Sequence, residues 1–157
     1  MQIRKAIIED VRNIIEVVQA SYKFSYRGYL PDEYLDDLSI TDDVFEKWKN
    51  YINKKESYVA EHQNQIVAFM MLDSSSEECF EICILYVKPE NQKIGFGSSL
   101  VNYAFDIKKS SGYKRCELWT IKNGPSMGFY NKVGFIMTGE EKSWKFDIPI
   151  VRMIKGV

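Results

Sequence analysis

Two closely spaced glycines, Gly95 and Gly97, lie where an apolar run gives way to an amphipathic one. The apolar run at 82–87 predicts a strand, and the pattern after the glycines predicts a helix from about 96 to 109. The first N–H groups of a helix have no partners within it and together carry about half a positive charge. Glycines let the backbone approach an anion closely. The stretch therefore predicts a phosphate-binding turn.

The residues around the glycines discriminate between two well-known nucleotide-binding loops. A P-loop requires Gly-Lys-Ser/Thr at its end, and here Ser98 and Ser99 follow Gly97, which excludes it. A dinucleotide fold requires three glycines directly after a strand and an acid about 20 residues further on. Glu117 fits that acid, but Leu100 fills the third glycine position and no second βαβ half follows, so this alternative is disfavoured.

Two motifs resemble those of the GNAT N-acetyltransferase family. Gln92-x-x-Gly95-x-Gly97 after Leu85-Tyr86-Val87-x-Pro89 resembles the family's acetyl-CoA pyrophosphate loop, and Asn123 to Phe135 resembles its second signature, F-Y-x-x-x-G-F after an Asn. The match is clearest over 79–139. It implies one GNAT domain over 1–157. The implied fold is α+β (α/β), with a mixed, mostly antiparallel sheet of about seven strands, flanked by helices and splayed between strands 4 and 5.

Composition limits the class of protein. A chain of 157 residues with 45% hydrophobic and 14% aromatic residues suits one globular domain. A net charge of −1 without a basic block argues against nucleic acid as a partner. No apolar run is long enough for a membrane span and Met1–Lys5 does not open a signal peptide, so we expect a cytoplasmic protein.

The three cysteines, Cys79, Cys83 and Cys116, lie in expected strands and are interpreted as buried free thiols of a cytoplasmic protein. The first two lack the C-x-x-C spacing and have no neighbouring His, so we expect no metal site.

Periodicity and turn residues predict the remaining elements. Val11, Ile14, Ile15 and Val18 share one face of an amphipathic helix, Pro31 begins a short helix, and Thr41 caps a third helix. The other expected elements are strands near 3–7, 57–61, 66–72, 79–87, 114–120, 135–138 and 146–154, and a helix over 125–132.

The resemblance implies direct transfer of an acetyl group from acetyl-CoA to an amine. The thioester carbonyl must then be polarised, and a backbone N–H at Val87 is the implied donor, an interaction that contributes about 3–4 kcal/mol in such sites. Leu85 and Val87 would pair with the pantetheine amides as an added strand does. Their side chains also fit a plain core role.

The resemblance assigns acetyl-CoA contacts to two stretches. Gln92 and Lys93 would add donors to the pyrophosphate, while Ile94 and Phe96 would anchor the loop in apolar surroundings. Asn123 also reads as the N-cap of the helix at 125–132. The complete cofactor-binding set is Leu85, Tyr86, Val87, Gln92, Lys93, Ile94, Gly95, Phe96, Gly97, Ser98, Asn123, Ser126, Phe129, Tyr130 and Lys132.

Two residues are candidates for proton transfer. Tyr130 is the implied general acid, since a phenol with pKa about 10 holds its proton at neutral pH and a thiolate with pKa near 8.5 can accept it; a core aromatic is the alternative. Glu81 is the candidate base, because it lies six residues before Val87 and the period of two puts both on one strand face. A water chain as base, with Glu81 a surface glutamate, is the alternative.

The acceptor is expected to be a primary amine of a small molecule or peptide. Tyr22, Phe24, Tyr26 and Tyr29 are candidates for the wall of its pocket, in a segment that resembles the "Y-R-G-x-L-P" of a bacterial GNAT subgroup. Helix-end packing is the alternative for these aromatics. Six acids within twelve residues, without Lys or Arg, would attract a polyamine or would simply be solvated: Asp32, Glu33, Asp36, Asp37, Asp42 and Asp43.

Two other classes of function remain open at this point. A non-catalytic acyl-CoA sensor would keep the cofactor loop without turnover, and a nucleotide-dependent oxidoreductase would bind NAD and not CoA. The family also makes a homodimer plausible, although no residue pattern indicates one.

Overall fold

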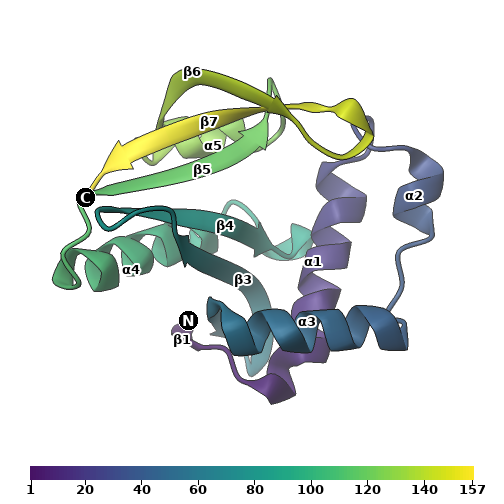
Figure 1. Cartoon of the computed structure of the whole chain (residues 1–157). Helices are drawn as coiled ribbons and strands as arrows, with labels where there is room; N and C mark the ends of the chain where they lie inside the picture. The colour runs from purple at the N-terminus through teal and green to yellow at the C-terminus, as the bar shows by residue number, and fades with distance from the viewer. The chain divides into compact units, whose positions relative to one another are not determined.

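A computed structural model describes all 157 residues. The chain divides into two compact units, Met1–Leu72 with Ile84–Tyr103, and Asp73–Cys83 with Ala104–Val157. Strand β4 (Cys79–Val87) and helix α4 (Phe96–Ser110) each contribute residues to both units (Figure 1). The expectation of a single domain over 1–157 remains a prediction.

Seven strands form a mixed sheet in the order β1-β2-β3-β4-β5-β7-β6. The pairs β1–β2, β2–β3, β5–β7 and β6–β7 are antiparallel, while β4 and β5 are parallel. The parallel register joins Cys79–Glu81 to Arg115–Glu117 at the start of both strands. The predicted mixed, mostly antiparallel sheet is thus confirmed. The remaining strands are β1 (Gln2–Lys5), β2 (Glu56–His62), β3 (Gln65–Ser74), β5 (Arg115–Ile121), β6 (Ile136–Ser143) and β7 (Pro149–Gly156).

In the first unit, three helices accompany β1 to β3: α1 (Val11–Ser25), α2 (Asp32–Asp36) and α3 (Asp42–Lys54). The apolar stripe of α1 is buried as its spacing predicts, and α1 packs against α3 (Figure 1). Thr41 caps α3, because its hydroxyl accepts the N–H of Val44 at 3.3 Å. The core beneath α1 also takes in Val59 and Phe69 from β2 and β3.

In the second unit, edge-to-face aromatic contacts hold α4 and α5 (Met127–Lys132) to the sheet. The ring centroid of Phe80 lies 5.5 Å from that of Phe105, and the Phe105 and Phe135 centroids are 6.1 Å apart. Phe135 continues the series to Tyr130 at 5.8 Å. Such pairs contribute about 0.5–1.5 kcal/mol each beyond the area that they bury.

Strand β6 carries an irregularity opposite Arg152. Met137 pairs with Met153 and Glu141 with Val151, so the three residues 138–140 lie opposite one residue of β7. Gly139 has a φ of +90° within this bulge, a conformation that L residues with side chains avoid.

Three local predictions were wrong. The helix expected from 125 begins at Met127 with Ser126 in the N-cap position, and Asn123 instead adopts a left-handed conformation with φ 54°. The strand expected from 146 begins at Pro149, because Lys145–Asp147 forms a short 3-10 turn between the antiparallel strands β6 and β7. Cys83 is exposed, while the other two free thiols are buried as expected.

Candidate active site

The predicted strand, loop and helix start are present in the first unit. After β4, a 3-10 turn (Pro89–Asn91) leads into a loop in which Lys93 and Gly95 have φ values of +64° and +102°. Helix α4 begins at Phe96, and the N–H of Ser99 donates to the Gly95 carbonyl at 3.0 Å. The N–H groups of residues 96–98 precede this bond. They are the donors that a helix start presents to an anion.

One side chain anchors this loop. Phe96 is 5% exposed and its ring centroid lies 5.5 Å from that of His62. Ile94 is 65% exposed, so the prediction that it also anchors the loop was wrong. Lys93 is exposed beside it, where a cationic side chain can meet an approaching anion. The loop is therefore anchored by one buried aromatic ring, while Lys93 and Ile94 are exposed to solvent.

The last peptide of β4 is held in a defined orientation. The N–H of Lys88 donates to the Val67 carbonyl of β3 at 2.8 Å. Because C=O and N–H of a trans peptide point in opposite directions, the Val87 carbonyl points away from β3. In an extended strand the N–H and C=O of one residue share an edge. The Val87 N–H therefore lies on the edge of β4 that faces away from β3.

Two side chains donate to the Val87 carbonyl oxygen. The Gln92 amide nitrogen lies 3.2 Å from it and the Ser21 hydroxyl 3.1 Å. Gln92, predicted as a pyrophosphate donor, thus engages its side chain within the chain and closes the junction of strand and loop. Ser21 belongs to α1, so this helix is joined to the end of β4.

The candidate acceptor aromatics separate into two groups. Tyr22 and Tyr26 pack edge-to-face with Tyr86 of β4, with ring centroids 5.5 and 6.3 Å from it. Phe24 is 63% exposed and Tyr29 39%, so these two are more open to solvent. Burial raises the pKa of Tyr26, although its contact with Tyr86 lowers it in part. Burial and the two neighbouring tyrosines raise the pKa of Tyr86.

The acidic segment after α1 lies at the surface. A guanidinium nitrogen of Arg27 lies 3.2 Å from a carboxylate oxygen of Asp32 and 3.0 Å from one of Asp36, which offsets part of the negative charge. The six acids are all exposed: Asp32, Glu33, Asp36, Asp37, Asp42 and Asp43.

In the second unit, Tyr130 lies on α5 and is 9% exposed. Its ring packs between Phe129 and Phe135, with centroids 5.3 and 5.8 Å away, and its carbonyl accepts the N–H of Phe135 at 2.9 Å. The short helix and the turn at Gly134, whose φ is +99°, match the expected second motif. Tyr130 is thus held by its neighbours in one orientation.

The turn that leads into α5 explains the conformation of Asn123. A Cβ on Gly124 would lie 2.7 Å from the Cβ of Ile121, so only glycine fits here. The N–H of Gly124 donates to the Ile121 carbonyl at 2.9 Å, and the N–H of Asn123 lies 3.0 Å from the Met127 sulfur. Asn123 and Lys132 are exposed at the two ends of this motif.

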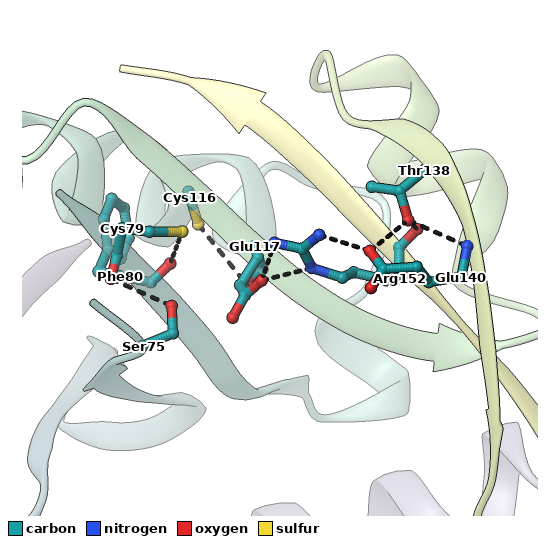
Figure 2. A network of polar contacts seen from close by, with 8 residues as sticks. All are labelled: Ser75, Cys79, Phe80, Cys116, Glu117, Thr138, Glu140 and Arg152. Carbon is teal, nitrogen blue, oxygen red and sulfur yellow. Dashed lines mark hydrogen bonds and ion pairs between the residues drawn. The ribbon is translucent and has the colours of Figure 1, made fainter.

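A polar network crosses β5, β7 and the β6 bulge, and sequence reasoning missed it. The Arg152 guanidinium donates to Glu117 and to Glu140, as Figure 2 shows. Glu117 is 9% exposed and lies opposite Glu81 in the parallel register. The contact with Arg152 lowers the pKa of Glu140, and Thr138 adds a smaller effect.

Ser21 also escaped the sequence reasoning. It lies three residues after Val18 on the apolar face of α1 and is 1% exposed. A polar residue on a buried stripe requires a hydrogen-bond partner, which was the available signal. For Arg152 no such signal existed, because strand pairing alone brings it beside Glu117.

The structure contains no group of three or more His, Cys, Asp and Glu side chains placed to hold a metal ion. None of its helices combines the length and the apolar character that crossing a bilayer requires.

Known proteins resemble the chain over nearly its whole length. Spermidine N(1)-acetyltransferase of Thermoplasma acidophilum is 30% identical over 142 residues, which cover 86% of this chain and 88% of that protein. The N-acetyltransferase YuaI of Bacillus subtilis, itself uncharacterized, is 26% identical over 155 residues, with coverages of 96% and 87%.

A solved structure gives the same result for the fold. PaiA N-acetyltransferase from Thermoplasma acidophilum, in complex with coenzyme A, superposes with a TM-score of 0.81 at 26% identity, covering 99% of this chain and 98% of that one. Residues 15–135 match the model of the Acetyltransferase (GNAT) family. With this match and the strand, loop and helix start in place, the chain belongs to the GNAT family and is an N-acetyltransferase that uses acetyl-CoA as its donor.

Proposed function

We propose that the chain transfers acetyl directly from acetyl-CoA to a primary amine of a small molecule or peptide, as one cytoplasmic domain over 1–157. The observation that carries this proposal is the orientation of the Val87 backbone at the end of β4. Its N–H lies on the edge of β4 that faces away from β3, a few residues before a loop and helix start that present backbone donors. A polarising group and an anion-binding turn are thereby adjacent in the chain.

In this proposal, backbone groups make most of the contacts with acetyl-CoA. The N–H groups of residues 96–98 and the loop at 92–95 receive the diphosphate, with Lys93 adding charge. The edge of β4 at Leu85 and Val87 pairs with the pantetheine amides. Asn123, Ser126, Phe129 and Lys132 supply the contacts of the second motif.

Val87 is the proposed oxyanion donor. Its N–H donates to the thioester oxygen as that oxygen gains negative charge. The donor needs little reorganisation, since the peptide that follows it, Val87–Lys88, is already fixed by the Lys88 and Ser21 contacts. A preorganised donor of this kind lowers the activation free energy of acetyl transfer by about 3–4 kcal/mol.

Tyr130 is the proposed general acid. A phenol ordinarily titrates near pH 10 and a thiol near 8.5, so the tyrosine holds a proton that the departing thiolate can take. The packing of Tyr130 between Phe129 and Phe135 supports this role, because a proton donor must be held in one orientation.

Glu81 is the proposed base for the amine, directly or through water. Deprotonation of an alkyl ammonium at neutral pH costs roughly 4–5 kcal/mol, and a carboxylate beside the amine can accept the proton and pass it to water. Glu81 lies opposite Glu117, whose carboxylate already pairs with Arg152. The pairing commits Glu117 to a structural partner and supports Glu81 as the carboxylate that takes up the proton.

A polyamine is the proposed acceptor. The relative from Thermoplasma acidophilum is named for spermidine, and the exposed acids at 32–43 supply a field that attracts a polycation. Tyr22 and Tyr26, with the more exposed Phe24 and Tyr29, supply aromatic surface at the end of α1. Arg27 weakens the field without cancelling it, since it pairs with only Asp32 and Asp36.

Three measurements test these proposals. In a thermal-shift series, CoA and acetyl-CoA should raise the melting temperature and NAD should not. In a turnover panel of spermidine, amino sugars, amino acids and peptide N-termini, spermidine should be acetylated fastest. Turnover of other amines alone would end the polyamine proposal. Binding of CoA without turnover of any amine would instead indicate an acyl-CoA sensor. Light scattering at the same concentrations would report whether the chain forms the expected homodimer.

A further inference from the structure

We propose that Ser21 is a positioning residue for acetyl transfer, an inference that rests on the proposed role of Val87 as oxyanion donor. The Ser21 hydroxyl lies 3.1 Å from the Val87 carbonyl oxygen and 2.8 Å from that of Val17, one turn earlier in α1. The hydroxyl has one hydrogen, which it shares between these two carbonyl oxygens in a bifurcated hydrogen bond. The shared bond ties the last turns of α1 to the last peptide of β4.

The position of Ser21 makes this tie specific. Ser21 is 1% exposed on a helix face otherwise filled by apolar residues. A hydroxyl buried there must hydrogen-bond, and the Val17 carbonyl alone would satisfy it, as often happens for serine within a helix. The additional contact with Val87, 66 residues away in the chain, joins the helix to β4 and is not needed to satisfy the hydroxyl.

The consequence for the reaction follows from the geometry of the peptide. Ser21 and Gln92 both donate to the Val87 carbonyl, while the N–H of Lys88, in the same peptide unit, is bound to β3. Three contacts thus fix the plane of the Val87–Lys88 peptide. The Val87 N–H belongs to the preceding peptide unit, and in an extended strand it shares an edge with the Val87 carbonyl, so holding this carbonyl orients the N–H beside it.

Tyr22, the residue after Ser21, and Tyr26, at the C-terminal end of α1, both contact Tyr86, which precedes Val87. Any amine that orders the end of α1 would therefore also steady the oxyanion donor. Ser21 connects the helix to this site most directly, since it contacts the Val87 carbonyl itself, whereas Tyr22 and Tyr26 contact the neighbouring Tyr86.

Ser21→Ala tests the proposal, with Ser57→Ala as the matched control. Ser57 is a second buried serine of the same unit, 2% exposed, whose hydroxyl donates to the Lys55 carbonyl at 3.2 Å, far from β4 in sequence. We expect Ser21→Ala to lower kcat about tenfold to a hundredfold, because small misplacements of reacting groups have effects of this size. The Kd for CoA should stay within about twofold, since the lost interaction acts in the transition state.

An NMR measurement checks the contact independently of activity. In Ser21→Ala the carbonyl ¹³C signal of Val87 and the amide signal of Lys88 should both move, and in Ser57→Ala neither should. Ser21→Cys, which preserves the volume and keeps a weak donor, should have intermediate kcat; it also serves if Ser21→Ala does not fold.

The outcomes separate this inference from the proposed function. A wild-type kcat in Ser21→Ala together with a shifted Val87 signal would show that the tie has no role in transfer, and an unmoved signal would show that the tie is absent. Either result overturns the inference while acetyl transfer stands. Absence of turnover by the wild-type chain with every amine would overturn the proposed function itself, and the positioning role with it.

Discussion

The hydroxyl groups of Tyr26 and Tyr86 lie 2.9 Å apart, joining the C-terminal end of α1 to β4. Both rings also pack edge-to-face with Tyr22, so the pair is shielded from water on its apolar sides. Burial of the two phenols favours their neutral forms and raises the pKa of both. This has a direct consequence for stability at high pH.

We expect the protein to lose stability above about pH 10, the ordinary pKa of tyrosine. Burial raises the pKa of Tyr26 and Tyr86 in the folded state, so their contribution is complete below the unfolded value and declines as the pH rises above it. Tyr86→Phe should flatten this decline and cost about 1 kcal/mol at pH 7. Urea midpoints between pH 7 and 11 measure both effects. Tyr29→Phe, at an exposed site, is the control, and an unchanged slope in Tyr86→Phe would contradict the assignment.

Tyr130→Phe should lower kcat by about 10²–10⁴, the usual range for loss of a general acid. The ring and its contacts with Phe129 and Phe135 remain, so the Kd for CoA should be unchanged. Steady-state kinetics with acetyl-CoA and isothermal titration with CoA measure the two quantities. Tyr103→Phe, which removes a phenol from α4, should behave as wild type. Equal kcat in the two variants would exclude Tyr130 as the acid.

Gly95→Ala should weaken CoA binding. Gly95 has a φ of +102°, and a side chain in this region costs about 1 kcal/mol or more. Gly112 is a matched control at the other end of α4, because it too has a positive φ of +86° and open space around an added Cβ. Both variants should lose similar stability in urea, but only Gly95→Ala should raise the Kd for CoA. A normal Kd in Gly95→Ala would remove the loop from donor binding.

Arg152→Met should destabilise the protein by about 3 kcal/mol, because it leaves the buried carboxylate of Glu117 without its cation. The exposed pair of Lys122 and Glu141 offers a contrast, with 46% and 43% of the side chains exposed. Lys122→Met should cost about 0–1 kcal/mol. Urea unfolding at pH 7 compares the two. Similar losses would contradict the view that Arg152 neutralises a buried carboxylate.

The strand, loop and helix start at 79–110 could be predicted because their signals are local. Apolar residues, Pro89, two glycines and a helical period follow one another in the sequence, and each acts on its neighbours. The same holds for the Thr41 cap and for the apolar face of α1. For these elements local preference and the final fold agree.

Other features depend on which surfaces the fold covers. Periodicity placed Cys83 and Ile94 on apolar patterns, but it could not tell that both are exposed. The N-cap preference of Asn123 was overridden by the tight turn that Gly124 makes against Ile121. The contacts of Ser21 with Val87, and of Arg152 with Glu117, join residues 66 and 35 positions apart, so no local pattern reports them.

The bulge opposite Arg152 has a further consequence, since β6 is the outermost strand at one end of the sheet. An outermost strand offers unpaired backbone groups to other molecules and promotes self-association when it is long, regular and apolar. Ile136 and Met137 are exposed there, but the irregular segment and the charges of Glu140, Glu141 and Lys142 follow at once. A foreign strand could pair with only a short apolar stretch. The guanidinium that donates to Glu140 in the bulge thereby helps to keep short the stretch of β6 that another chain could extend.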